Sequence, residues 1–289
     1  MLVSTYNKEI VPALPAYSKF VGRSCMLLQG GRRVSEIGVM YPFEELAGWF
    51  RFDNPQKIKQ GSYVSPVTDY QKISGILTNE FRRDFTFVHP EFFLEDKYSI
   101  KNGVVKLENK ENFQEYKIMI ISGCNTISYK TLEKLKAFYD NGGTVISTTQ
   151  LPHKSSEPGA DEKIIALIKG IFGVNTLEAD TVSILTNKNS KGGKAIFIPE
   201  PSKETLQAAL SAIPADVQFE PNPASVEFGK FSYIHKIRDG KQIYYFANSS
   251  DEVINTEVLL KGRLKLENWN PHDGNVSQIK DVEVIKKTD

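Results

Sequence analysis

The chain has 289 residues, of which 40% are hydrophobic, enough for one large domain or two ordinary ones with separate cores. Its 36 basic and 35 acidic residues leave a formal net charge of +1, so composition gives no sign of the basic face that nucleic-acid binding requires. No apolar stretch is as long as a membrane span, and the two cysteines, Cys25 and Cys124, are too few for a disulfide framework. We expect both cysteines to be buried.

The first 36 residues form a lead-in segment in which a helix is predicted around Tyr17–Gln29. Gly30-Gly31 ends this helix, because glycine adopts the left-handed conformation without a Cβ clash. A short apolar strand follows at Ile37–Tyr41, and Pro42 ends it because proline cannot donate to a strand ladder. Residues 43–67 are interpreted as a long loop that carries large aromatic side chains, namely Phe43, Trp49, Phe50, Phe52 and Tyr63.

The middle of the chain alternates between helix and strand patterns. Apolar residues recur at helical spacing from Asp69 onward, and a second strand is predicted at Phe85–Val88. Gly103–Leu107 has the pattern of a small additional strand. These elements lead into the most informative part of the sequence.

That part is a βαβ unit within Tyr116–Gln150. Two runs rich in β-branched residues, Lys117–Ser122 and Gly143–Thr149, flank a helix for which Ser128 is the N-cap and Asn141-Gly142-Gly143 the stop signal. Strands joined by a crossover helix are parallel, and a parallel sheet is covered by helices on its faces. The remaining elements of this region are a helix, two strands and a final helix, predicted at Glu162–Ile171, Thr181–Leu185, Lys194–Ile198 and Ser202–Ala212.

The pattern changes after residue 215, where apolar and polar residues alternate. Phe231–Ile237 and Gln242–Ala247 flank Asp239-Gly240, which is a strong signal for a β-hairpin. Further strands are predicted at Val253–Leu260, Leu264–Trp269 and Val282–Ile285. We therefore expect an α/β fold: a lead-in segment (1–36), a parallel-sheet domain (37–214) and a smaller antiparallel, sandwich-like domain (215–289).

Ligands of open α/β sheets bind at the carboxyl ends of the parallel strands, so polar residues after these strands are candidates for a ligand crevice. They are Tyr41, Glu44, Glu45, His89, Cys124, Asn125, Thr149 and His153. The plainer interpretation is that the histidines satisfy loop carbonyls and that the glutamates are solvated charges. Cys124 lacks the Gly-x-Cys-x-Gly turn that exposes a nucleophile, so we interpret it as structural. Trp49 and Trp269 are candidates for stacking on a sugar ring, with a packing role as the equal alternative.

Known cofactor motifs are missing from the sequence. Gly192-Gly193-Lys194 lacks the first glycine and the hydroxyl residue of a phosphate loop, and no Gly-x-Gly-x-x-Gly follows the first strand. The four histidines, His89, His153, His235 and His272, show no metal-ligand spacing. We expect neither a cofactor nor a metal, and we assign no catalytic residue.

The segments nevertheless resemble, in their order, the region that follows the catalytic barrel in bacterial glycoside hydrolases of family 106, the α-L-rhamnosidase-like enzymes. The resemblance rests on Arg23, Ser24, Leu27, Leu28, Gly30 and Met40-Tyr41-Pro42, and then on FTFVHPEFF, YKIMIISGCNTIS, LKAFYDNGGTVISTT, YIHKIRDGKQIYYFANSS and LENWNPHDGNV. It implies a class I glutamine-amidotransferase-like, or flavodoxin-like, domain followed by a β domain. The resemblance also extends to the domain that mediates trimer contacts in some β-galactosidases.

Family 106 enzymes carry their catalytic carboxylates in the barrel, and this chain has no room for one, so no catalytic residue is transferred. The resemblance implies a non-catalytic accessory region of a carbohydrate-active enzyme, whose partner is the barrel of the parent protein. The alternatives are a self-sufficient hydrolase that uses the crevice and a carbohydrate-binding module. Carbohydrate binding and homo-oligomerisation stay open, whereas nucleic acid and membrane are not expected partners. The N-terminus has no signal-peptide pattern, and location is left open, with a periplasmic or secreted bacterial parent as one reading.

Overall fold

The computed structural model describes residues 7–8, 10–50, 65–108, 113–175, 183–211, 213–223, 231–280 and 282–285. Its helices are η1 (Val11–Ala13), α1 (Leu14–Leu28), α2 (Phe43–Trp49), α4 (Tyr70–Gly75), the π-helical turn η2 (Ile76–Glu80), α5 (Pro90–Phe93), α6 (Tyr129–Asp140), α7 (Asp161–Phe172) and α8 (Lys203–Leu210).

The strands of the first two thirds are β1 (Arg32–Arg33), β2 (Ile37–Met40), β3 (Thr86–Val88), β4 (Tyr98–Lys101), β5 (Val104–Leu107), β6 (Gln114–Tyr116), β7 (Ile118–Ile121), β8 (Thr126–Ile127), β9 (Thr144–Thr148), β10 (Lys154–Ser155), β11 (Leu185–Lys188) and β12 (Lys194–Ile198). Those of the last third are β13 (Val217–Glu220), β14 (Phe231–Arg238), β15 (Lys241–Asn248), β16 (Glu257–Leu260), β17 (Glu267–Trp269) and β18 (Val276–Gln278).

A six-stranded mixed sheet forms the centre of the α/β part, with the order β11-β12-β9-β7-β2-β3. Neighbouring strands run parallel except β11, which pairs with β12 in the antiparallel sense. Every residue of Ile37–Met40 and of Ile118–Ile121 is buried, as expected for strands covered on both faces. The predicted strands of the βαβ unit are therefore confirmed to within one residue at each end.

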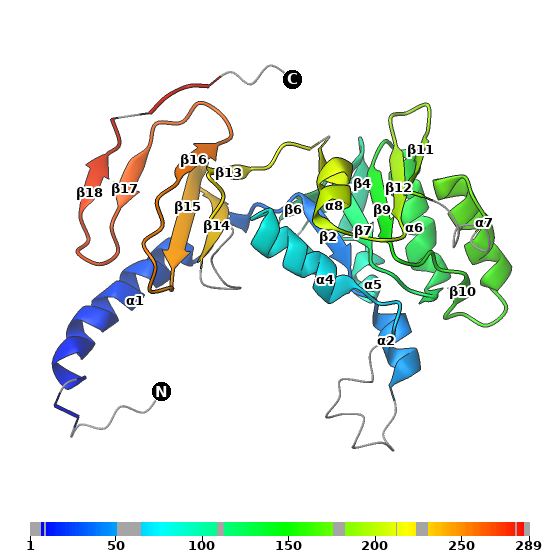
Figure 1. Ribbon diagram of the computed structural model, residues 1–289, viewed down its shortest axis with the longest axis horizontal. Coiled ribbons are helices and arrows are strands. Elements are labelled where there is room, and N and C mark those ends of the chain that lie inside the picture. The colour runs from blue at the N-terminus through cyan, green and yellow to red at the C-terminus, as the bar shows by residue number, and fades with distance from the viewer. Residues whose placement is uncertain are drawn as a thin grey trace.

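Helices cover both faces of this sheet (Figure 1). On one face, the apolar side chains of α6 and α7, among them Leu132, Phe138 and Ile168, pack with Met119 and Val145 of the strands. The other face is covered by α4, η2 and α8, from which come Ile73, Leu77, Leu206 and Leu210. The sheet with its two helical layers contains most of the buried core.

The capping residues of α6 behave as the sequence predicts. The Ser128 side chain accepts a hydrogen bond from the Thr131 amide at the start of the helix. At its end Gly142 has a φ of 95°, and a Cβ on Gly143 would lie 2.2 Å from the Phe138 ring. Glycine is therefore required at both positions, one for its backbone conformation and the other for the close approach of a ring.

The lead-in segment attaches to the C-terminal strands, far from it in sequence. β1 pairs with β14, with Arg32 opposite Ile237, and α1 lies beside the same hairpin (Figure 1). The Tyr245 hydroxyl lies 3.2 Å from Ser24 Oγ, and Arg238 Nη1 donates to the carbonyls at the end of α1. This contact is not predictable from the sequence, because a two-residue strand of arginines shows no apolar alternation.

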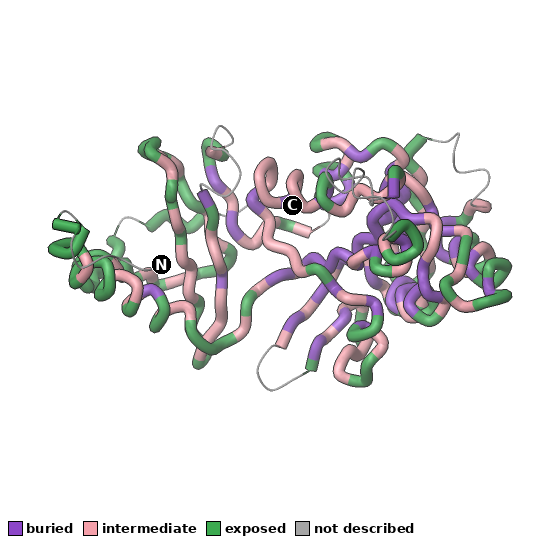
Figure 2. Tube along the Cα trace, turned by 90° about the horizontal axis from the view of Figure 1, so that it is seen from below, coloured by how far each residue is buried: buried purple, intermediate pink, exposed green. Residues whose placement is uncertain are grey.

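The C-terminal region is antiparallel, and the β14–β15 hairpin is confirmed, with positive φ at Asp239 and Gly240. Among the described residues the strands fall into small sheets of the order β1-β14-β15, β13-β16 and β17-β18, and Phe219 of β13 packs against Phe231 and Phe246 of the hairpin. Figure 2 shows that buried residues concentrate in the α/β part, whereas this region is mainly half-buried or exposed. The strand predicted at Val282–Ile285 is wrong, since these residues are exposed and unpaired in any sheet.

Other predictions also require correction. The segment 43–67, predicted to be a loop, begins with α2. Glu44 and Glu45 lie in the first turn of this helix, where acidic side chains favour a helix start. Residues 51–64, which include Phe52 and Tyr63, lie outside the described chain. Of the strand predicted at Thr181–Leu185, residues 181–182 lie outside the described chain, and the strand that pairs with β12 begins only at Leu185, as β11. Cys25 is exposed rather than buried.

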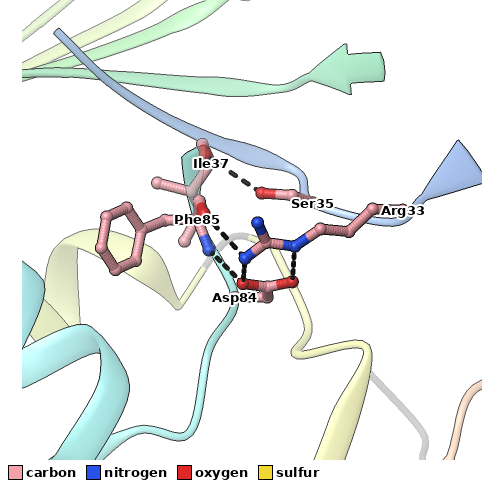
Figure 3. Close-up of polar contacts among 5 residues, drawn as sticks. All are labelled: Arg33, Ser35, Ile37, Asp84 and Phe85. Carbon is pink, nitrogen blue, oxygen red and sulfur yellow. Dashed lines mark hydrogen bonds and ion pairs between the residues drawn. The ribbon is translucent and has the colours of Figure 1, made fainter. Parts of the chain in front are cut away.

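Arginine side chains join the α/β part to the β region. Arg33 of β1 forms a bidentate ion pair with Asp84 and donates a further hydrogen bond to the Phe85 carbonyl (Figure 3). Arg82, which is only 4% exposed, donates to the carbonyls of Phe231 and Pro223 at 3.0 and 2.7 Å. Because the second arginine is buried and its acceptors are main-chain atoms, we infer that it carries more of the junction's stability.

Candidate functional site

The candidate site lies at the carboxyl ends of the parallel strands. β2 stands between β3 and β7, so the chain order reverses at the β2/β7 boundary, where ligands of open α/β sheets usually bind. Tyr41 follows β2, His89 follows β3, Cys124 and Asn125 follow β7, and Thr149 follows β9. The structure therefore brings most of the predicted crevice residues together at the carboxyl ends of the parallel strands.

Glu45 lies at the centre of this carboxyl end of the sheet. It projects from α2, is 2% exposed, and accepts hydrogen bonds from the backbone amides of Asn125 and Thr126, both at 2.9 Å. The Asn125 side chain donates to it at 3.1 Å and the Ser65 hydroxyl at 2.6 Å. Each carboxylate oxygen thus has two donors, so the main-chain donors that a bound anion would need are already engaged.

Asp69 plays the same part on the neighbouring loop. Its Oδ1 accepts from the Gly123 amide at 2.8 Å and from the Thr148 hydroxyl at 3.0 Å, and its Oδ2 accepts from the Thr149 hydroxyl at 2.7 Å. Thr149 has a φ of 55°, unusual for a β-branched residue. The candidate residue Thr149 is thus directed at an internal carboxylate.

Glu157 fills the N-terminus of α6, the position that binds phosphate groups in many α/β proteins. It accepts from the Tyr129 amide at 2.8 Å, from Ser128 Oγ at 2.7 Å and from Ser155 Oγ at 2.6 Å. Burial alone would raise the pKa of Glu157, but these hydrogen bonds outweigh it and lower the pKa to about 2. Sequence reasoning missed both Asp69 and Glu157, because their main-chain partners, the amides of Gly123 and Tyr129, are distant in sequence.

Cys124 is 3% exposed, as predicted for a structural thiol. Burial raises the pKa of Cys124 well above its ordinary value, and the nearby carboxylates Glu45, Glu44 and Asp69 raise it further. A thiol in such surroundings stays neutral and is a poor nucleophile. These surroundings therefore disfavour the thiolate chemistry that a cysteine at this place in the fold would otherwise suggest.

A small hollow remains beside Glu45. It is lined by Tyr41, Glu44, Ser122 and Cys124, together with Met40, Pro42, Pro90, Ile121, Thr126 and Ile127, and encloses about 240 Å³, including open solvent. Because that figure includes open solvent, the enclosed space is smaller still and lies below the roughly 300–1,000 Å³ of usual ligand pockets. Burial raises the pKa of Glu44, and the Ser122 hydroxyl has no hydrogen-bond partner within the described residues.

The remaining candidates lie away from this hollow. His153 donates its amide to the Asn125 carbonyl at 2.9 Å and so supports the loop through its main chain. Trp49, at the end of α2, is 43% exposed, and Trp269, in β17, is 45% exposed. Figure 1 places α2 and β17 in different parts of the molecule, so the tryptophans do not form one stacking surface.

Among the described residues, no group of three or more histidine, cysteine, aspartate and glutamate side chains is arranged to hold a metal ion. None of the helices in the described ranges is long and apolar enough to cross a membrane.

Comparison with solved structures finds glycoside hydrolases. A catalytic mutant of Gan42B, a GH42 β-galactosidase from G. stearothermophilus, is 15% identical with a TM-score of 0.51, and the match covers 94% of this chain and 41% of that one. For Gan42B in another structure the identity is 14% and the TM-score 0.48, over 84% of this chain and 38% of that one. The first likeness concerns the fold alone, and this chain spans less than half the length of either protein.

Comparison of the sequence itself is more specific. No curated protein sequence matches the chain. The model of one family, described as alpha-L-rhamnosidase, matches residues 6–282, in agreement with the resemblance found in the sequence. The chain therefore belongs to glycoside hydrolase family 106, the alpha-L-rhamnosidase family.

Proposed function

We propose that this chain is a non-catalytic accessory region of a carbohydrate-active enzyme, which supports a catalytic barrel carried elsewhere in the parent protein. The observation that carries the proposal is that the buried Glu45 carboxylate already accepts four hydrogen bonds from the protein itself. With Asp69 and Glu157 it holds together the loops at the place where a substrate would otherwise bind.

Glycoside hydrolysis requires two free carboxyl groups, one on each side of the scissile bond, with one of them protonated at working pH. Burial raises the pKa of Glu44, which is the direction that a general acid requires. Its neighbour Glu45 is directed at backbone amides, so it is not free to act as the partner. One carboxyl group with a raised pKa beside a small hollow does not make a glycosidase site.

The α/β part is proposed to have the flavodoxin-like arrangement, which class I glutamine amidotransferases share. Numbered along the chain, the parallel strands β2, β3, β7, β9 and β12 stand in the order 2-1-3-4-5, the flavodoxin-like order, with β11 added at the edge. Amidotransferase chemistry does not follow from this proposal, since Cys124 is buried and burial raises its pKa. The proposed boundaries are 37–214 for this domain and 215–289 for the β domain, with α1 and β1 attached to the latter.

One observation favours a second candidate, a self-sufficient hydrolase that uses the crevice. The hollow contains Glu44, whose pKa is raised by burial, beside the unpartnered hydroxyl of Ser122. A carboxyl group with a raised pKa and a hydroxyl group without a partner are the kinds of groups that proton transfer requires.

An activity assay separates the two candidates. The purified chain is incubated with a panel of aryl glycosides that includes α-L-rhamnosides and β-galactosides, in parallel with Glu44→Gln and with Glu95→Gln, an exposed control. We expect no turnover by any of the three proteins. Turnover by the wild-type chain that Glu44→Gln abolishes and Glu95→Gln retains would refute the accessory role and establish the hydrolase.

A further inference from the structure

A group of aromatic rings extends from the candidate site to the edge of the sheet. The Tyr41 ring lies 5.6 Å from Tyr70 and 6.2 Å from Phe87, measured between ring centroids. The His89 ring continues the group, 5.0 Å from Phe43 and 5.4 Å from Phe92. We call Phe43, Phe87 and Phe92 the aromatic surface, because these three side chains are 42%, 43% and 55% exposed.

Each member of the aromatic surface comes from a different element. Phe43 begins α2, Phe87 lies in β3 and Phe92 lies in α5. In the described residues β3 pairs with β2 on one side only and ends the six-stranded sheet. Folded proteins usually cover or blunt such an edge, and here it carries exposed phenylalanine rings instead.

The size of the surface argues for one kind of partner. A phenylalanine side chain has roughly 200 Å² of surface, so three rings that are about half exposed offer on the order of 300 Å². A stable complex of separate chains buries about 800 Å² on each partner, which these rings do not approach. A segment of the same polypeptide needs less contact, because a covalent connection provides an effective concentration of about millimolar or more.

The charges around the rings indicate what the partner carries. Glu91 is exposed beside Phe92, and Asp96 is exposed close by. Lys97 lies over the Phe92 ring, 5.3 Å from its centroid, but pairs with Glu95 at 2.6 Å. Lys134 donates to the Glu95 carbonyl at 3.3 Å, so the three carboxylates and two lysines leave a small net negative charge, which complements an apolar partner surface with basic residues at its border.

We propose that the aromatic surface is the docking site of the catalytic segment of the same polypeptide, and that this segment presents an apolar patch bordered by lysine or arginine. The proposal rests on the proposed accessory function. The proposed contact consists of three rings, on α2, β3 and α5. Phenylalanine has no polar tip, unlike the tyrosine and tryptophan that suit wet surfaces, which favours a protein partner over a sugar.

The test compares this chain alone with the full-length enzyme encoded by the same reading frame. Amide hydrogen exchange, followed by mass spectrometry, is measured for peptides that cover residues 86–94. We expect exchange there to be slower in the full-length enzyme by at least about tenfold, since a covered segment opens less often. Peptides of α1 serve as the internal control and should exchange alike in both proteins.

Two variants make the test specific. Phe92→Ser removes an exposed ring and should leave the melting temperature of the isolated chain unchanged while lowering that of the full-length enzyme by at least about 2 °C. Tyr17→Ser is the matched control, because Tyr17 is 64% exposed on α1, and it should change neither protein. Glu91→Lys should act like Phe92→Ser in the full-length enzyme, and its effect should shrink at high salt.

Each other outcome contradicts the proposal. Equal exchange of residues 86–94 in both proteins, or equal effects of Phe92→Ser in both, would show that the aromatic surface is not the docking site, although the accessory function would survive. A dimer of this chain that Phe92→Ser dissociates would assign the surface to a second copy. A reading frame that encodes no catalytic segment would overturn the proposal outright, and glycosidase activity of this chain alone would remove the proposed function on which it rests.

Discussion

Removal of the Glu45 carboxylate should be among the most destabilising single changes in this chain. Glu45→Ala leaves the partly buried amides of Asn125 and Thr126 without their acceptor, and it also removes the acceptor of the buried Ser65 hydroxyl. An unsatisfied buried donor costs about 1–3 kcal/mol, and water entering the space recovers a part of this. We expect the free energy of unfolding to fall by about 3–5 kcal/mol, a large share of the roughly 5–15 kcal/mol of a typical domain.

Thermal unfolding followed by circular dichroism measures this loss. At about 2–4 °C for each kcal/mol, the melting temperature should fall by about 10 °C in Glu45→Ala. Glu45→Gln should lose about half as much, because the amide keeps one acceptor oxygen but turns its NH2 group toward the donors. Glu44→Gln is the matched control on the same helix and should stay within about 1 kcal/mol of wild type, since burial raises the pKa of Glu44 and so already favours its neutral form.

Chemical rescue tests the reasoning more directly. If the vacated space keeps its donors, formate should bind there and raise the melting temperature of Glu45→Ala while leaving the wild-type protein unchanged. A Glu45→Ala protein that melts within 1 °C of wild type would refute the view that this carboxylate holds the loops together. If Glu45→Ala loses the expected stability but formate does not restore it, the loops collapse into the vacated space.

Three further predictions follow from other parts of the structure. Hydrogen bonds lower the pKa of Glu157 to about 2, so the stabilisation by the Glu157 carboxylate should be complete above about pH 4.5 and lost as pH falls toward 2. The difference in melting temperature between wild type and Glu157→Gln should therefore vanish at the acid end. A thiol reagent should modify the exposed Cys25 rapidly and the buried Cys124 only after unfolding, and rapid labelling of both would contradict the structure. Arg82→Ala should lower the free energy of unfolding by about 2–3 kcal/mol, whereas Arg33→Ala, which breaks a half-exposed ion pair, should cost about 1 kcal/mol or less; the reverse order in urea unfolding would contradict our account of the junction.

The sequence predicts those parts of the fold whose signals are local. The βαβ unit is an example, because apolar runs mark both strands, Ser128 caps the helix and Gly142-Gly143 ends it, all within 35 residues. The pairing of Arg32 with Ile237 could not be predicted, since its partners lie 205 residues apart and neither carries a pattern that identifies the other. The small sheets after residue 215 show the same limit, because alternation predicts strands but not which strands pair.

For the candidate site, location was predictable and chemistry was not. The rule that ligands bind at the carboxyl ends of parallel strands places Tyr41, Asn125 and Thr149 together, as the structure does. The partners of these residues decide what they do, and Glu45 reaches Asn125 across 80 positions of sequence. A sequence shows that a glutamate follows a strand, but only the packed structure shows whether its carboxylate faces solvent or backbone amides.

The arrangement of the carboxylates has a physical reason that bears on function. The loops after parallel strands and the N-terminus of the following helix present backbone N–H groups that need acceptors. In a binding protein an anionic ligand supplies these acceptors, and the loops stay adaptable until the ligand binds. Here Glu45, Asp69 and Glu157 supply them permanently, so the edge of the sheet is complete without a ligand. A sheet edge stabilised in this way is suited to holding the elements around it in fixed positions, among them α2, β3 and α5 with their exposed rings.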